Sequence, residues 1–170
     1  MKEYSGKVRV VFKNMVVHPQ VVMDAHKAGC AAGKQGKFDA FKDAFWDKAY
    51  DAYASAHDQS KLGVDNIMAI AKDIGLDTAK FKADMEGPEC KAQVEGDMAE
   101  LQKFRVSGTP FFFINGKILN GAVPKDEFKK VIDERIKVAE DSGVSGADYY
   151  EKEVMGKGDK QFRTKRRKPN

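Results

Sequence analysis

Cysteine is scarce in this sequence, and long hydrophobic runs are absent. Cys30 and Cys90 are the only cysteines among the 170 residues, and neither belongs to a Cys-x-x-Cys pair. They are too few for a disulfide framework and do not indicate a redox compartment. No stretch approaches the roughly 20 apolar residues of a membrane-spanning helix, so we expect no membrane partner. Residues 1–6 carry no secretory signal, and we predict a periplasmic location only if the N-terminus is incomplete.

Motifs of several common enzyme classes are also missing. Gly33-Lys34-Gln35-Gly36-Lys37 lacks the spacing of a phosphate-binding loop and does not follow a predicted strand. There is no Gly-x-Ser-x-Gly nucleophile elbow. His26 precedes Cys30 by one helical turn, a spacing that would suit a lowered thiol pKa or two metal ligands. No further ligand pair is apparent, so we expect neither a metal nor another cofactor.

Positive charge is concentrated at the C-terminal end of the chain. The formal net charge is +4, but residues 157–170 contain seven Lys or Arg residues against Asp159 alone, a balance of +6. Residues 1–156 therefore carry a formal charge of −2, so we expect no nucleic-acid binding by this part. We expect a disordered, solvated basic tail at 156–170. The alternative is an interaction module in which this tail binds an acidic partner or a nucleic acid.

Hydrophobic periodicity predicts one strand, a run of helices, and then a hairpin followed by a helix. Lys7–Lys13 is β-branched and aromatic with apolar residues on both faces, as in a strand buried on both sides of a sheet. Asn115-Gly116 between two β-rich runs is a strong hairpin signal. The predicted helices cover residues 20–32, 37–53, 64–74, 78–85, 89–104, 124–139 and 147–155, and the predicted hairpin strands cover 110–114 and 117–119.

Two stretches resemble the DsbA-like family of disulfide-bond-forming proteins. Val106–Gly116, followed by a helix that begins at Pro124, resembles the cis-proline loop and terminal hairpin of that family. Lys7–Lys13, His18-Pro19 and Gln35–Phe38 resemble its second strand and helical insertion. The resemblance covers about residues 3–155. It implies an α/β fold of thioredoxin type with a short sheet, a C-terminal β-hairpin plus helix, and an all-helical insertion at about 19–105.

The resemblance also implies a catalytic part that these residues do not contain. In the family, a strand and a helix with Cys-x-x-Cys at its N-terminus precede the strand that matches Lys7–Lys13, and the helix start stabilises the reactive thiolate. We therefore expect a truncated, incomplete thioredoxin-like domain over 1–155. Without the missing strand, the strands at 7–13 and 110–114 would pair directly with each other. Alternatively, another chain would supply a strand, for example in a homodimer. Otherwise the chain is a fragment.

Gly108, Thr109 and Pro110 are the candidate binding residues. The resemblance implies a cis peptide bond before Pro110, which leaves the backbone of Thr109 free to pair with an extended peptide. The alternative is that this turn serves the fold alone. Cys30 and Cys90 are a possible disulfide or redox pair, but free cysteines usually behave as small apolar residues, and we expect inert burial.

Phe38, Phe41, Phe45 and Trp46 form an aromatic stripe that we predict to be core. The alternative is a groove lining, and an exposed Trp46 or Tyr50 would favour contact with a peptide.

These observations predict a DsbA-like protein without catalytic residues of its own, which binds a peptide or protein through its cis-proline loop. The first alternative is an enzyme, a fragment of a thiol-disulfide oxidoreductase that forms or isomerises disulfides in proteins. The second is the interaction module that works through its basic tail.

Overall fold

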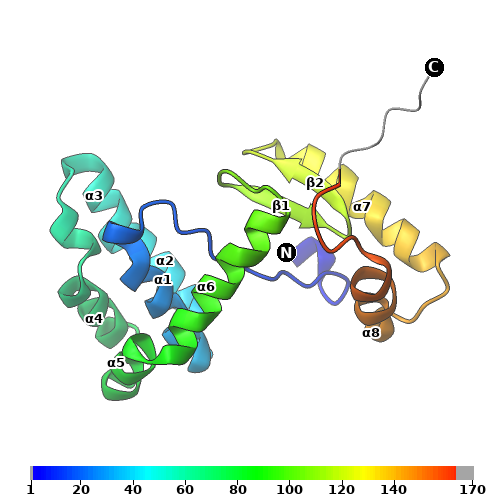
Figure 1. Ribbon diagram of the computed structural model, residues 1–170. Helices are drawn as coiled ribbons and strands as arrows, with labels where there is room; N and C mark the ends of the chain where they lie inside the picture. Colours follow the sequence, from blue (N-terminus) through cyan, green and yellow to red (C-terminus); the bar gives the residue numbers. More distant parts are fainter. Residues whose placement is uncertain (1, 164–170) are drawn as a thin grey trace. The chain divides into compact units, whose positions relative to one another are not determined.

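The structure is a computed structural model that describes residues 2–163, and it divides into two compact units (Figure 1). Unit 1 combines the two ends of the chain, Met1–Phe12 and Leu101–Asn170, and unit 2 is Lys13–Glu100. The end of the predicted basic tail, 164–170, lies outside the described residues. Between residues 2 and 163, no helix has both the length and the apolar character that crossing a membrane requires.

Unit 2 is built from helices. α1 (Pro19–Lys34) is followed by a continuous helical stretch of α2 (Phe38–Phe45), the π-helical η2 (Trp46–Tyr50) and α3 (Asp51–Ala56). The 3-10 turn η3 (Gln59–Leu62) leads to α4 (Val64–Asp73), α5 (Thr78–Glu86) and α6 (Pro88–Lys103), and the last residues of α6 belong to unit 1. The helices predicted between residues 20 and 104 are confirmed.

Local sequence explains where several of these helices begin and end. Pro19 occupies the first turn of α1, where a missing backbone N–H costs nothing. The Asp77 side chain caps α5 by accepting a hydrogen bond of 3.0 Å from the N–H of the third helical residue. At the end of α4, Lys37 Nζ donates to the carbonyls of Ile74 and Gly75 at 2.8 and 2.9 Å. The Gly33–Lys37 segment therefore holds the end of a neighbouring helix in place.

One hydrophobic core organises unit 2. Its largest fully buried side chains include Phe81, Ile67 and Leu62, which come from α5, α4 and η3. Val21, Val22 and Phe45 are among the half-buried side chains that pack against it. The core consists of Ala28, Ala31, Ala32, Phe41, Ala49, Leu62, Ile67, Ile70, Ala71, Leu76, Phe81, Met85 and Cys90.

Cys30 of α1 and Cys90 of α6 form a disulfide, with their Cα atoms 5.6 Å apart. The expectation of two inert, unpaired cysteines is therefore wrong. Cys90 belongs to the core and Cys30 packs against it, so the packing of the helices brings the two sulfur atoms together. Sequence spacing does not reveal such proximity, because a disulfide depends on the distance and direction of the two Cα–Cβ bonds.

The aromatic stripe is core only in part. Phe41 is buried, with its ring 5.7 Å from that of Phe81. Trp46 is 50% exposed, so the prediction of a core position is wrong for this residue. Phe45 and Trp46 are consecutive and point about 100° apart around a helix, and Phe45 is the one that faces the core.

Unit 1 contains the predicted hairpin. β1 (Phe111–Ile114) pairs antiparallel with β2 (Lys117–Asn120), and Phe113 faces Ile118 in the register. Asn115 and Gly116 have φ angles of 42° and 85°, the left-handed values of a two-residue hairpin turn. The turn prediction is therefore confirmed, because these residue types tolerate positive φ.

Helices follow the hairpin in unit 1. α7 (Lys125–Asp141) places the Phe128 ring edge-on to that of Phe112, at 4.6 Å. α8 (Gly146–Tyr149) continues into the π-helical η4 (Tyr150–Met155). Beyond η4, the chain returns to the end of α6, where the Phe162 N–H donates to the Lys103 carbonyl at 2.8 Å.

The strand predicted at Lys7–Lys13 is absent. After the short 3-10 turn η1 (Lys2–Tyr4), residues 8–13 form no strand. Among residues 2–163, no backbone hydrogen bond involves Val8, Val10 or Val11. A strand requires a neighbour for its N–H and carbonyl groups, and the described residues do not supply one here. The sheet has only the two strands β1 and β2 among the residues described. Direct pairing of 7–13 with 110–114, which was one of the three outcomes considered, therefore does not occur.

Candidate functional site

The loop between α6 and β1 carries the predicted binding residues Gly108, Thr109 and Pro110. It begins after Arg105, which has a positive φ of 55°, and the Val106 N–H donates back to the Leu101 carbonyl at 3.1 Å. The peptide bond between Thr109 and Pro110 is cis, the geometry that the family resemblance implies. Thr109 and Pro110 are exposed and Gly108 is half-buried. The three residues thus lie together at the start of β1.

The hydrogen bonding of this loop shows which backbone groups are unused. The Gly121 N–H donates to the Pro110 carbonyl at 2.9 Å, which extends the hairpin pairing by one residue beyond β1. Backbone groups alternate in direction along a strand that pairs antiparallel. The N–H and carbonyl groups of Thr109, Phe111 and Phe113 therefore point away from β2. Within residues 2–163, neither backbone group of Thr109 has a hydrogen-bond partner.

We call Thr109–Phe113 the open edge. Along this edge, Thr109, Phe111 and Phe113 direct their backbone groups outward, and the two residues between them face β2. The edge is about 14 Å long, at about 3.4 Å per residue. An unpaired edge of this kind can accept a further strand, because each outward N–H and carbonyl gains a partner.

Apolar side chains around the open edge are poorly covered. Phe113 and its register partner Ile118 are each 43% exposed. Elsewhere in unit 1, Val10 is 68% exposed, and Val11 is also exposed. Among the described residues of this unit, Val131 is the one hydrophobic residue that is buried. Unit 1 thus leaves hydrophobic side chains exposed to solvent, whereas unit 2 buries such side chains in its core.

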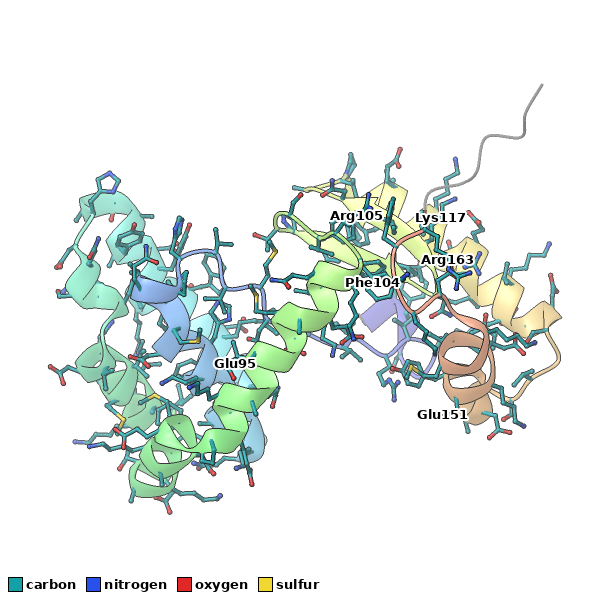
Figure 2. The ribbon with its side chains drawn as sticks, viewed as in Figure 1. Glu95, Phe104, Arg105, Lys117, Glu151 and Arg163 are labelled. Atoms are coloured by element: carbon teal, nitrogen blue, oxygen red, sulfur yellow. A yellow bond between two sulfur atoms is a disulfide. The ribbon has the colours of Figure 1, made fainter. Side chains whose placement is uncertain are left out.

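Aromatic rings connect the loop to the hairpin. Phe104 lies at the end of α6 (Figure 2). Its ring meets that of Phe113 edge-on at 5.4 Å. The Arg105 guanidinium lies 4.9 Å from the centre of the Phe162 ring. These contacts hold both ends of the loop within unit 1.

Polar contacts attach the N-terminal residues to α7. The Tyr4 hydroxyl donates to Asp133 Oδ1 at 2.8 Å, and this bond, which favours the protonated phenol, raises the pKa of Tyr4 to about 12. Glu3 pairs with Lys125 and Lys129, each at 3.2 Å, and these bonds lower the pKa of the Glu3 carboxyl. The segment that continues to Val11 is therefore tied to unit 1 at its start.

The structure does not bring the other candidate residues to this loop. Cys90 is the third residue of α6, whereas the loop follows the opposite end of that helix. Neither cysteine is a free thiol. The His26 Nδ1 atom lies 2.9 Å from Asn14 Oδ1. Among residues 2–163, no group of three or more His, Cys, Asp or Glu side chains could hold a metal ion.

A buried polar cluster in unit 2 was missed by sequence reasoning. Asp97 Oδ2 accepts hydrogen bonds from the Asn14 side chain at 2.7 Å and from its backbone N–H at 3.0 Å, and Lys13 Nζ lies 3.0 Å from Asp97 Oδ1. Burial lowers the pKa of the His26 imidazole at the other side of Asn14. The one signal in the sequence is the position of Asp97, which lies at helical spacing from Cys90 and Val94, the other buried residues of α6.

The hairpin with its preceding cis-proline loop, the following α7 and the inserted helices define a thioredoxin-like α/β domain with a helical insertion. This confirms the predicted fold class.

Comparison with known sequences gives the family. The family described as DSBA-like thioredoxin domain matches residues 5–133. The chain belongs to this family, as the loop and hairpin motifs predict.

Curated relatives carry a related name. Two proteins called "Probable disulfide bond formation protein D", from Bacillus cereus and Bacillus anthracis, are each 29% identical over 136 residues, which is 78% of this chain. The match covers 60% and 59% of their lengths, so the chain spans about three fifths of these relatives. A "Na(+)/H(+) antiporter NhaA" from Herminiimonas arsenicoxydans is 28% identical over 119 residues, 70% of this chain and 17% of that protein. No solved structure matches the chain.

Proposed function

We propose that this chain binds extended polypeptide segments by strand addition at the open edge, Thr109–Phe113. The observation that carries the proposal is the set of outward backbone groups of Thr109, Phe111 and Phe113, next to apolar side chains that unit 1 leaves uncovered. A bound strand would satisfy these groups and cover Phe113. Gly108, Thr109 and Pro110 would then contact the start of the bound segment.

A substitution at the register pair 113 and 118 tests this proposal. Phe113→Pro removes an N–H that points away from β2, and proline is tolerated at an edge position of this kind. Ile118→Pro is the matched control, because Ile118 faces Phe113, is equally exposed, and directs its own N–H to the opposite edge of the hairpin. Circular dichroism and hydrogen exchange of the hairpin establish that both variants remain folded.

The probe is insulin B chain with its cysteines carboxymethylated, which is unfolded and cannot form a mixed disulfide. One lost hydrogen bond of about 1 kcal/mol corresponds to a roughly five-fold weaker affinity. We expect this loss for Phe113→Pro and no comparable loss for Ile118→Pro. Equal affinities of both variants and the unaltered chain, or no binding of the probe to the unaltered chain, would refute strand addition at this edge.

A second copy of the chain is one donor of such a strand. Exchange between two identical chains would cover the uncovered apolar side chains of both copies and produce a homodimer. Light scattering over a range of concentrations tests this form of the proposal. A chain that is strictly monomeric and melts cooperatively would argue against exchange, while leaving binding of the B chain open to its own test.

Thiol-disulfide exchange is the second candidate function, because two relatives are named for disulfide bond formation. This reaction needs an accessible thiolate that attacks a disulfide, whereas both cysteines here are bonded to each other and Cys90 is fully buried. We expect no turnover in an insulin-reduction assay with the 170-residue chain. Turnover that Cys30→Ser abolishes would show that the Cys30–Cys90 pair is catalytic. An in-frame Cys-x-x-Cys codon pair upstream of Met1 would support an oxidoreductase that extends beyond these residues.

A further inference from the structure

A second stretch of unit 1 has backbone groups without partners. We call residues 8–12 the Val10 segment, which forms neither helix nor strand (Figure 1). It consists of three valines, an arginine and a phenylalanine, and valine and phenylalanine are residue types that strands favour. Among residues 2–163, no backbone hydrogen bond involves Val8, Arg9, Val10 or Val11. The Val10 segment therefore has the composition of a strand but lacks a neighbouring strand among the described residues.

The chain is anchored on both sides of the Val10 segment. Before it, the Lys7 N–H donates to the Tyr4 carbonyl at 2.9 Å, and the Tyr4 hydroxyl is bonded to Asp133 of α7. After it, the Asn14 N–H donates to Asp97 Oδ2 at 3.0 Å. A segment that is held at both ends loses little conformational freedom when it pairs with another strand, so the entropy cost of that pairing is small.

The apolar side chains of the Val10 segment are exposed. Val10, Val11 and Phe12 are each more than half exposed, and Phe113 on the open edge is 43% exposed. The segment and the open edge are both five residues long, and both contain outward or unpaired backbone groups next to uncovered apolar side chains. Both belong to unit 1, but they do not pair with each other within one chain. Each element therefore offers what the other lacks.

We infer that two copies of this chain form a homodimer in which the Val10 segment of each copy pairs with the open edge of the other. The inference rests on the proposed function, because it uses the same edge and names the donor of the added strand. One chain carries both the donor and the acceptor, so a two-fold axis produces two identical junctions. Each junction gives partners to the outward N–H and carbonyl groups of Thr109, Phe111 and Phe113.

The area that such a dimer would bury is that of a weak but specific interface. A phenylalanine side chain buries about 200 Å², so the half-exposed Phe12 and Phe113 of both copies contribute about 400 Å² in total. The exposed valines and the paired backbone of both junctions raise this to roughly 1,000 Å², the lower limit for a specific interface. We therefore expect a dimer that forms at micromolar concentration and dissociates on dilution.

Sedimentation velocity over a range of concentrations measures this dimer. Val10→Asp with Val11→Asp introduces carboxylates at positions that the junction would cover, and should weaken dimerisation at least about ten-fold. Val64→Asp with Val138→Asp replaces two exposed valines outside the segment and the edge. This matched control should dimerise as the unaltered chain does. Circular dichroism establishes that the variants remain folded.

A mixture of two defective chains tests which elements meet. Phe113→Pro removes one hydrogen bond from each of the two junctions and should weaken its own dimer about 25-fold. When this variant is mixed with the Val10→Asp, Val11→Asp variant, one junction of the mixed dimer combines an unaltered segment with an unaltered edge. We therefore expect heterodimers at concentrations at which either variant alone is monomeric.

Binding of the carboxymethylated insulin B chain separates this inference from the proposed function. The Val10→Asp, Val11→Asp variant keeps the open edge and should still bind the B chain. A chain that binds the B chain but stays monomeric, a dimer that survives both substitutions in the segment, or a mixture that forms no heterodimer would overturn the inference and leave the proposed function standing. Absence of a dimer together with absence of B-chain binding would refute both.

Discussion

Removal of the Cys30–Cys90 bond is expected to destabilise unit 2 strongly. The bond closes a loop with a sequence separation of 60 between α1 and α6. In the chain-entropy model, a cross-link over a loop of this length lowers the entropy of the unfolded chain by an amount worth about 4 kcal/mol at 25 °C. The same free energy is lost from the stability of the folded unit when the bond is reduced. This is a large share of the stability of a typical domain.

Urea unfolding followed by Trp46 fluorescence measures this effect, because Trp46 lies in unit 2 and is the only Trp. With an m-value of about 1 to 2 kcal/mol/M, the urea midpoint should fall by roughly 2 to 4 M. Cys90 is fully buried, so the bond is reduced in urea before refolding in the presence of reductant.

The variant Cys30→Ala with Cys90→Ala provides an independent measurement of the same loss. It should unfold at a similar midpoint to the reduced protein, with a small further decrease from the removed sulfur atoms. A reduced protein and a double variant that both unfold within about 0.5 M of the oxidised chain would show that the bond contributes little, and the entropic reasoning would then be wrong for this fold.

Three further predictions concern polar groups that the structure places in defined surroundings. Asp97→Ala leaves the Asn14 side chain and backbone N–H without their acceptor and should lower the unfolding free energy of unit 2 by about 2 to 3 kcal/mol. Urea unfolding measures this loss. Glu95→Gln, on the exposed side of α6, is the control and should change the unfolding free energy little. Burial lowers the pKa of His26 in the folded state, so the unfolded chain binds a proton at His26 at a higher pH than the folded chain does. The contribution of His26 to the unfolding free energy should be complete above about pH 6.5 and should decrease as the pH falls below that value. A pH profile of stability as steep in His26→Gln as in the unaltered chain would contradict this. The hydrogen bond to Asp133 raises the pKa of Tyr4 to about 12, so an ultraviolet titration should show one phenol ionising later than the others, and both Tyr4→Phe and Asp133→Asn should remove that late step.

The elements governed by local chemistry are the ones that sequence reasoning placed correctly. The hairpin follows from Asn115-Gly116, because these two residues tolerate the positive φ values that the turn needs. The helices of unit 2 follow from periodic apolar residues that one core can bury. The candidate loop with Gly108, Thr109 and Pro110 was also found, because Val106–Gly116 resembles the cis-proline loop and hairpin of the DsbA-like family.

The errors concern features that depend on a partner distant in sequence. Lys7–Lys13 has the composition of a strand, but composition does not supply the neighbouring backbone that a strand requires. Trp46 has the hydrophobicity of a core residue, but the rotation of the helix about its axis directs Phe45 to the core instead. Asp97 was missed, because its burial and its two hydrogen bonds from Asn14 depend on a segment 83 residues away in the sequence.

By itself, the sequence determined the helices, the hairpin, the cis-proline loop and the family, since each of these depends on residues that are close together along the chain. Only the tertiary structure decided that Cys30 meets Cys90, that Asn14 meets Asp97, and that the outward backbone groups of Thr109, Phe111 and Phe113 are left without a neighbour. The physical reason is that a bond or an unpaired group is defined by which atoms lie within a few ångströms, and folding brings together atoms that the sequence separates by dozens of residues.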